Sequence, residues 1–152
     1  MCIRDSYGSV ARVGDIMKRQ IVSVGAGDRL STVEDIMTLG GVRHMPVVSG
    51  GRLVGVVSER DLLRASLSNL DAAGQDDRRA FLHAVEIRTV MSAPPIVIGP
   101  RATVKRAART MADHKIGCLP VVDDLGRLVG LVTETDLLLY VAHHWQPPPG
   151  EE

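Results

Sequence analysis

The stretch Arg52-Leu53-Val54-Gly55-Val56-Val57-Ser58-Glu59-Arg60-Asp61-Leu62-Leu63 occurs a second time, in closely similar form, later in the chain. The second copy reads Arg127-Leu128-Val129-Gly130-Leu131-Val132-Thr133-Glu134-Thr135-Asp136-Leu137-Leu138. Two shorter matches precede it in the same order: Met45-Pro46-Val47-Val48 recurs as Leu119-Pro120-Val121-Val122, and Asp15-Ile16-Met17 as Thr89-Val90-Met91. Several matches in constant order predict a chain built from two copies of one structural unit.

Each copy follows the plan of a β-α-β-β-α repeat. A short apolar run opens it, at 21–24 and again at 95–98, and apolar residues at helical spacing follow. Gly40-Gly41 predicts the end of the first helix, because glycine tolerates a left-handed cap. Two apolar runs around a polar turn then predict a hairpin, and a second helix follows Ser58 and Thr133. We expect buried strands to hold Val47, Val56, Val121 and Leu131.

The repeats divide the chain into a first copy at 10–67, a linker at 68–84 and a second copy at 85–145. Each half has about 60 residues, which is too few to bury much surface alone. We therefore expect an α+β fold in which the two repeats pack face to face with pseudo-twofold symmetry. The proline-rich residues 146–152 predict a disordered tail. Residues 1–9 match nothing later and resemble translated sequencing-adapter DNA, so whether they are native is left open.

The bulk composition excludes several classes of function. Eighteen basic and eighteen acidic residues cancel, so the chain lacks the basic character typical of nucleic-acid binders. No apolar run approaches the roughly 20 residues of a membrane span, and no signal peptide is visible. Cys2 and Cys118 are too few for a disulfide scaffold and suit a reducing compartment. We expect a cytoplasmic protein with no nucleic-acid or membrane partner.

The duplicated motifs resemble the CBS domain, named for cystathionine beta-synthase. The features that carry the resemblance are the Pro-Val-Val strand, the strand Leu-Val-Gly followed by two apolar residues, and the Ser/Thr-x-x-Asp that comes next, over residues 13–141. The resemblance implies a pair of repeats with two clefts between the sheets, which in this family often bind adenine nucleotides. It also implies a homodimer, which we expect on the helices that follow Asp28 and Arg101.

Ser58 to Asp61 and Thr133 to Asp136 are the sharpest local motifs. A hydroxyl and a carboxylate three residues apart at a helix start resemble a capping box, in which both side chains bond backbone N–H groups. A helix start also offers N–H groups to a phosphate, and a carboxylate can accept two ribose hydroxyls. The family resemblance assigns the ribose to Asp61 and Asp136, with Ser58 and Thr133 as helpers.

The two sites differ in the basic residues beside them. Arg43, His44 and Arg60 accompany Asp61, whereas Gly117, Cys118 and Thr135 stand at the matching positions of the second copy. Arginine binds phosphate with a two-pronged fork, so we expect the nucleotide beside Asp61. The alternative is that Arg43 and Arg60 are ordinary surface charges. By resemblance, the adenine wall would come from the opposite repeat: Ile96, Ile116 and Gly117 for Asp61, and Ile21, Val42 and Arg43 for Asp136.

No motif predicts catalysis or a metal. There is no Walker-type phosphate loop and no nucleophile elbow. His44 and Cys118 could supply only two ligands, whereas zinc sites usually need three or four. We expect a regulatory module, not an enzyme, that has no resident cofactor, senses AMP, ADP, ATP or a relative, and signals to an effector protein through a population shift. The alternatives are a ligand-free dimerisation module and a detached regulatory fragment of a larger enzyme or transporter, such as the inosine monophosphate dehydrogenase or magnesium-channel types.

Overall fold

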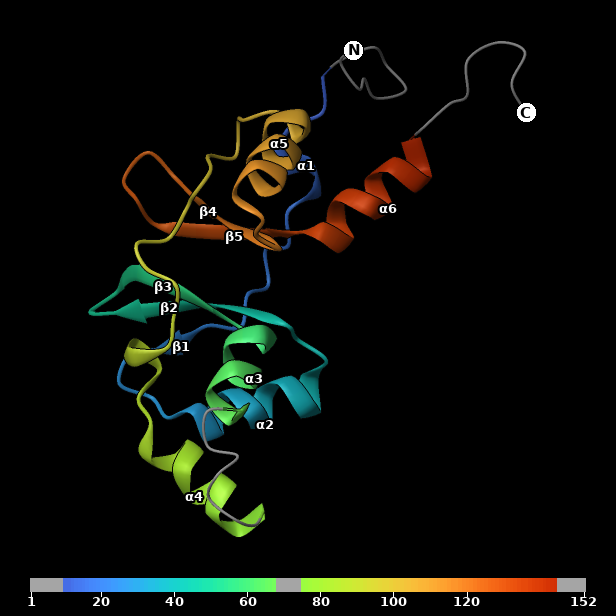
Figure 1. Ribbon diagram of the computed structural model, residues 1–152. Coiled ribbons are helices and arrows are strands. Elements are labelled where there is room, and N and C mark those ends of the chain that lie inside the picture. Colours follow the sequence, from blue (N-terminus) through green and yellow to red (C-terminus); the bar gives the residue numbers. More distant parts are fainter. Residues whose placement is uncertain (1–9, 68–74, 145–152) are drawn as a thin grey trace. The chain divides into compact units, whose positions relative to one another are not determined.

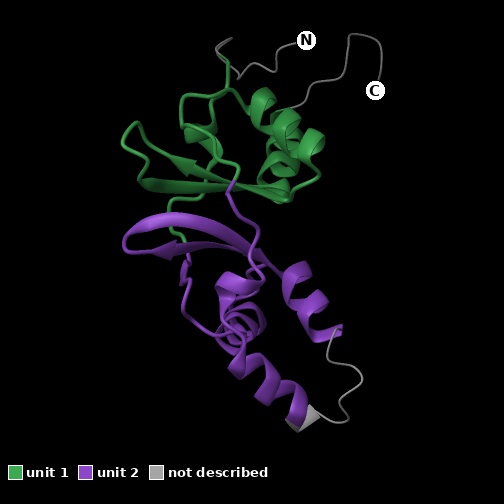
Figure 2. Ribbon diagram, turned by 60° about the vertical axis from the view of Figure 1, so that its left-hand side comes forward, with its two compact units in different colours: residues 1–21, 96–152 green, residues 22–95 purple. Residues whose placement is uncertain are grey.

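A computed structural model describes residues 10–67 and 75–144, which fall into two compact units. Unit 1 comprises residues 1–21 and 96–152, and unit 2 comprises residues 22–95 (Figure 2). Each unit holds one small sheet with helices, so the expected α+β fold of two repeats is confirmed. The expectations for residues 1–9, for 68–74 of the linker and for the tail lie outside the described residues.

Unit 2 contains a three-stranded sheet in the order β1-β2-β3 (Figure 1). β1 (Val24–Gly25) runs parallel to β2 (His44–Ser49), and β2 pairs antiparallel with β3 (Arg52–Ser58). The helices are α2 (Leu30–Gly40), α3 (Glu59–Leu67), α4 (Gln75–Ala84) and the 3-10 helix Ile87–Thr89. Gly41 ends α2 with a φ of 64°, as the glycine pair predicts.

Unit 1 repeats this plan with one strand fewer. Its hairpin consists of β4 (Cys118–Val122) and β5 (Leu128–Thr133), and its helices are α1 (Val13–Ile16), α5 (Val104–His114) and α6 (Glu134–His144). Ile98 forms a parallel bridge with Val121, where Val24 pairs with Val47 in unit 2. Both hairpins carry an irregularity after the equivalent residues Val47 and Val121. The two copies of the sequence therefore fold into equivalent structures.

The expected strand core is confirmed at three of its four positions. Val47, Val121 and Leu131 are buried, but Val56 is only half-buried. The neighbouring Val57 is fully buried instead, because successive residues of a strand face opposite sides of the sheet. The backbone of Val56 exchanges two hydrogen bonds with Ser92, at 3.1 and 2.9 Å.

The segment that opens each sequence repeat packs against the hairpin of the other repeat. In unit 1 the backbone of Lys18 exchanges two hydrogen bonds with Leu131, both of 2.9 Å. Ser92 and Val56 do the same in unit 2. The boundaries of the compact units thus differ from the sequence boundaries at 10–67 and 85–145, because residues 10–21 lie in unit 1 and residues 85–95 in unit 2.

Residues 75–84, which the sequence places in the linker, form α4 and pack on α2 (Figure 1). Leu82 on α4 is fully buried in the core of unit 2. Arg78 and Arg79 form ion pairs with Glu34 on α2. Burial raises the pKa of Glu34, but the hydrogen bonds and charges of the two arginines outweigh it and hold the pKa below its usual value of 4.5. The second half of the expected linker is therefore part of the folded core.

Within the described ranges, no helix is both long and apolar enough to cross a membrane.

Candidate functional site

The Ser58 motif forms a capping box at the start of α3. The Asp61 carboxylate oxygen Oδ2 accepts hydrogen bonds from the Ser58 backbone N–H at 2.8 Å and from its hydroxyl at 3.0 Å. In return, the Asp61 backbone N–H donates to the Ser58 hydroxyl oxygen at 3.2 Å. This is the reciprocal pattern of the capping box, with aspartate in the place of the usual glutamate. Both hydrogen bonds from Ser58 use the same carboxylate oxygen, and no described residue hydrogen-bonds Oδ1 of Asp61.

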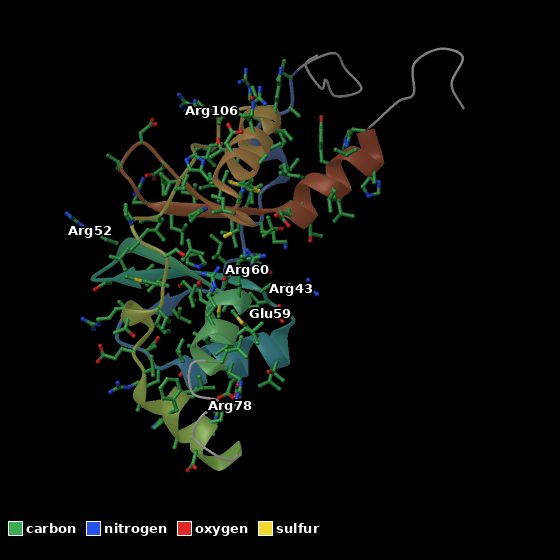
Figure 3. The ribbon with its side chains drawn as sticks, in the orientation of Figure 1. Arg43, Arg52, Glu59, Arg60, Arg78 and Arg106 are labelled. Atoms are coloured by element: carbon green, nitrogen blue, oxygen red, sulfur yellow. The ribbon has the colours of Figure 1, made fainter. Side chains whose placement is uncertain are left out.

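The basic residues expected beside Asp61 lie at the same end of unit 2. His44 pairs with Ser58 across the hairpin, and the backbone carbonyl of Arg43 accepts the N–H of Glu59 at 2.9 Å. Figure 3 shows Arg43, Glu59 and Arg60 at the start of α3, while Arg52 lies at the far end of the hairpin. Arg60 is exposed. Local pairing of β2 with β3 therefore brings together all five residues predicted for this half of the site.

Two details of this end of unit 2 are not evident from the motif. The side chain of Glu59 lies 3.7 Å from Arg43, so an acidic group already accompanies one of the expected phosphate ligands. The backbone N–H groups of Ser58, Glu59 and Asp61 are all occupied by hydrogen bonds within the unit. The start of α3 therefore offers a phosphate mainly its arginine side chains, and fewer free N–H groups than a bare helix terminus would.

Unit 1 carries the second capping box with nearly the same geometry. Oδ2 of Asp136 accepts from the Thr133 N–H at 2.8 Å and from its hydroxyl at 3.0 Å. The other carboxylate oxygen differs, because the ammonium of Lys18 lies 3.7 Å from it. Sequence reasoning missed Lys18, although the repeat offset aligns it with Ser92, which has no charge.

The residues expected to form the adenine wall for Asp61 lie in unit 1, which also contains Asp136. The carbonyl of Gly117 accepts the N–H of Glu134 at 3.0 Å, directly beside the Thr133 box. Ile96 and Ile116 are partly buried against the core of unit 1. Unit 1 thus places these three residues in the unit of the second capping box, while Asp61 belongs to unit 2.

Metal ligands do not gather in the part of the chain that the structure describes. No group of three or more His, Cys, Asp or Glu side chains there could hold an ion. His44 and Cys118 belong to different units. The chemistry that the two capping boxes offer is therefore hydrogen-bond acceptance by carboxylate oxygens, with cations nearby.

Relatives at moderate identity match most of this chain. The inosine-5'-monophosphate dehydrogenase of Korarchaeum cryptofilum is 30% identical over 135 residues, which are 89% of this chain and 25% of that protein. An uncharacterised protein of Methanocaldococcus jannaschii is 33% identical over 133 residues, which are 86% of this chain and 47% of that protein. The chain therefore spans a quarter to a half of the length of these relatives.

Solved structures with the same fold include proteins with bound nucleotides. The CBS domain of a membrane protein from Sphaerobacter thermophilus is 29% identical, with a TM-score of 0.72 and coverage of 90% of this chain and 88% of that one. CBSX2 in complex with AMP is 25% identical, with a TM-score of 0.72 and coverage of 88% and 97%. The cytosolic domain of the Mg2+ channel MgtE in complex with ATP is 28% identical, with a TM-score of 0.65 and coverage of 84% and 48%.

The family model named CBS domain matches the chain twice, over residues 13–68 and 87–143. The two matches coincide with the two copies of the duplicated strands and capping boxes. The chain belongs to the CBS domain family and is a tandem pair of such domains.

Proposed function

We propose that this CBS pair is a regulatory module that binds an adenine nucleotide at the start of α3, with Asp61 as the acceptor for the ribose hydroxyls. The observation that carries the proposal is the arrangement of the Asp61 carboxylate. Oδ2 is held by Ser58, while no described residue hydrogen-bonds Oδ1. A carboxylate that is oriented on one side and open on the other suits a ligand that donates hydroxyl hydrogen bonds.

The phosphate of the ligand would be held by the arginines at this end of unit 2. Arg60 is exposed beside Asp61 and forms no ion pair with any described residue. Arg43 is paired with Glu59, but both side chains are exposed, and such pairs are worth only about 0.2–1 kcal/mol. Arg43 can therefore leave Glu59 at little cost in free energy. It would gain hydrogen bonds to a phosphate, which are stronger than those between neutral groups because both partners are charged. We keep His44, in the same unit, as a further proposed contact.

Lys18 supports the choice of Asp61 over Asp136. Its ammonium lies beside the carboxylate oxygen of Asp136 that would have to accept the ribose hydroxyls. A ribose at Asp136 would have to displace or compete with this cation, whereas the residue that matches Lys18 in the other copy is the uncharged Ser92. Two related structures that contain AMP and ATP support the adenine nucleotide as the class of ligand.

The signal would pass to a second copy or to an effector protein through the apolar helix faces. We expected a homodimer on α2 and α5, but among the described residues α2 exposes only Leu39 and α5 exposes no large apolar side chain. Among the described helices, the other exposed large apolar residues lie on α3 of unit 2 (Leu63 and Leu67) and on α6 of unit 1 (Leu138, Leu139 and Val141). We therefore propose assembly contacts on the apolar face of α3 in unit 2 and on that of α6 in unit 1. Each helix begins at a capping box, so ligand and partner would share an element.

Calorimetric titration with AMP and ATP tests the proposed site. Asp61→Ala and Arg60→Ala should each weaken binding by about tenfold or more, because each removes a hydrogen bond to a charged group. Arg52→Ala is the matched control, since Arg52 is exposed in the same unit at the other end of the hairpin (Figure 3). The proposal fails if Asp136→Ala abolishes binding while Asp61→Ala and Arg60→Ala bind normally.

Two other outcomes would favour the alternatives. If no adenine nucleotide changes the melting temperature while sedimentation shows a dimer, the chain is a ligand-free dimerisation module. If the chain binds an adenine nucleotide but no separate partner protein changes its activity, the chain is better explained as a regulatory piece of a larger protein. The chain matches only 25% of the length of the related dehydrogenase, which agrees with that alternative.

A further inference from the structure

Unit 1 contains a cavity of about 510 Å³ that the proposed nucleotide site does not use. Every residue that lines it belongs to unit 1: Arg12, Gly99, Pro100, Arg101, Ala102, Thr103, Arg106, Asp123 and Asp124. The cavity lies at the turn of the β4-β5 hairpin, while Thr133 lies at the other end of β5. Its volume falls within the range of about 300–1,000 Å³ that is typical of small-molecule sites.

The walls of this cavity are held by backbone hydrogen bonds. The N–H groups of Val13 and Gly14 donate to the carbonyls of Ala102 and Pro100, both at 2.8 Å. At the hairpin turn, the carboxylate of Asp123 accepts from the backbone N–H and the Nε of Arg127, both at 2.8 Å. A cavity formed by paired backbone does not have to order itself when a ligand enters, which lowers the cost of binding.

The charge of the cavity is predominantly basic. Three arginines line it, and within residues 10–67 and 75–144 no acidic side chain forms an ion pair with Arg101 or Arg106. Of the two aspartates, Asp123 stays ionised, because hydrogen bonds from the Arg127 backbone and side chain hold its pKa below the usual value, and its charge is compensated by the Arg127 guanidinium at 2.8 Å. Asp124 is exposed, and it is the lining aspartate that forms no ion pair with a described residue.

The repeat shows that the fold does not require these arginines. The bridge between Arg12 and Thr103 in unit 1 corresponds to the bridge between Glu86 and Arg29 in unit 2. There the arginines already have an acidic partner, because Glu86 pairs with Arg88 at 2.8 Å and with Arg29 at 3.7 Å. At the positions that match Arg101 and Arg106, unit 2 has glycine and threonine. All three arginines are thus features of unit 1 alone, and a structural role common to both repeats does not explain them.

We propose that this cavity is a second ligand site, which binds a small phosphorylated molecule. Arg101 and Arg106 hold the phosphate by forked hydrogen bonds, and Arg12, whose Nη1 already donates to the Arg101 carbonyl at 3.0 Å, fixes the position of that loop. Asp124 accepts hydroxyl groups of the rest of the molecule. The side chain of Arg106, and not the backbone at the start of α5, binds the phosphate, since the N–H groups of Val104 and Arg106 already donate to the Ala11 carbonyl and the Thr103 hydroxyl.

Titration of the full chain with inorganic pyrophosphate tests this site, because the probe carries only the phosphate chemistry. The double variant Arg101→Gln/Arg106→Gln should bind at least about tenfold more weakly than the unchanged chain. Arg109→Gln, which removes an exposed arginine of α5 outside the cavity, should bind normally. Thermal melting of each variant shows whether the fold is intact, and Arg106→Lys, which keeps the charge but loses the fork, should be intermediate.

The site is distinguishable from the proposed nucleotide site. Asp61→Ala should leave pyrophosphate binding at the cavity unchanged, and the double variant should leave AMP binding unchanged. The proposal is overturned if the folded double variant binds pyrophosphate as tightly as the unchanged chain, if Arg109→Gln loses as much affinity, or if the unchanged chain shows no binding at millimolar pyrophosphate.

Discussion

Gly55→Ala should destabilise the fold, because the glycine lets the Met91-Ser92 segment cross β3 at close range. A Cβ atom at position 55 would lie 2.7 Å from the sulfur of Met91 and 2.8 Å from the backbone oxygen of Ser92. Comfortable contacts between heavy atoms of this kind begin at about 3.5 Å, so both approaches are too close by more than half an ångström. The methionine can turn aside, but the Ser92 oxygen is fixed by its 3.1 Å hydrogen bond from Val56.

The expected loss follows from this overlap. Overpacking of a filled site typically costs about 1–3 kcal/mol, and the lower entropy of the unfolded alanine chain offsets at most about 1 kcal/mol. For a protein of this size each kcal/mol lowers the melting temperature by about 2–4 °C. Gly130→Ala should behave alike, since a Cβ there would overlap Met17 in unit 1.

Urea unfolding followed by circular dichroism measures this loss, with Gly40→Ala as the control. A Cβ at Gly40 would meet only Val42, at an ordinary 3.5 Å, and its position in α2 favours alanine. The control should be neutral or stabilised by up to about 1 kcal/mol. If Gly55→Ala unfolds at the same urea concentration as Gly40→Ala, the close crossing of the two segments is wrong.

Three further predictions concern the capping boxes and α4. Asp61→Ala and Asp136→Ala should each lower the free energy of unfolding by about 1 kcal/mol in urea titrations, and no change in either would contradict the capping role. In an Asp61→Ala background, Lys18→Met should strengthen AMP binding at Asp136 by up to about fivefold, whereas weaker binding by calorimetry would mean that Lys18 holds the phosphate. Because the pKa of Glu34 is lowered in the folded state, its ionised carboxylate stabilises the fold above pH 4.5, and this stabilisation is lost as the pH falls through the folded-state pKa. The difference in the free energy of unfolding between the unchanged chain and Glu34→Gln should therefore disappear in acid. A difference that does not change with pH would refute this.

Much of the candidate site could be predicted from the sequence because its parts are local. The capping boxes join residues three apart, and the hairpin brings Arg43 and His44 to Ser58 by a turn of two glycines. The motif could not reveal which neighbouring side chains pair with these groups. Glu59 forms an ion pair with Arg43, and Lys18 forms one with a carboxylate oxygen of Asp136. Both ion pairs depend on where the side chains lie in space.

The sequence by itself determined the duplication, the α+β class, the hairpin and the two main helices of each repeat, and the family. These features follow from the spacing of apolar residues, from the turn residues and from the helix-capping residues. Each of these signals involves only a few neighbouring residues, and each occurs twice in the chain. The tertiary structure alone decided which segment packs on which hairpin: Lys18 bonds Leu131, more than a hundred residues away, although the repeat would equally allow each segment its own hairpin. It also decided that α4 belongs to the core of unit 2, since the burial of Leu82 depends on α2, and that Arg12 lines one cavity with the distant Arg101 and Arg106. Contacts of this range are set by the packing of the whole unit, and no local pattern encodes them.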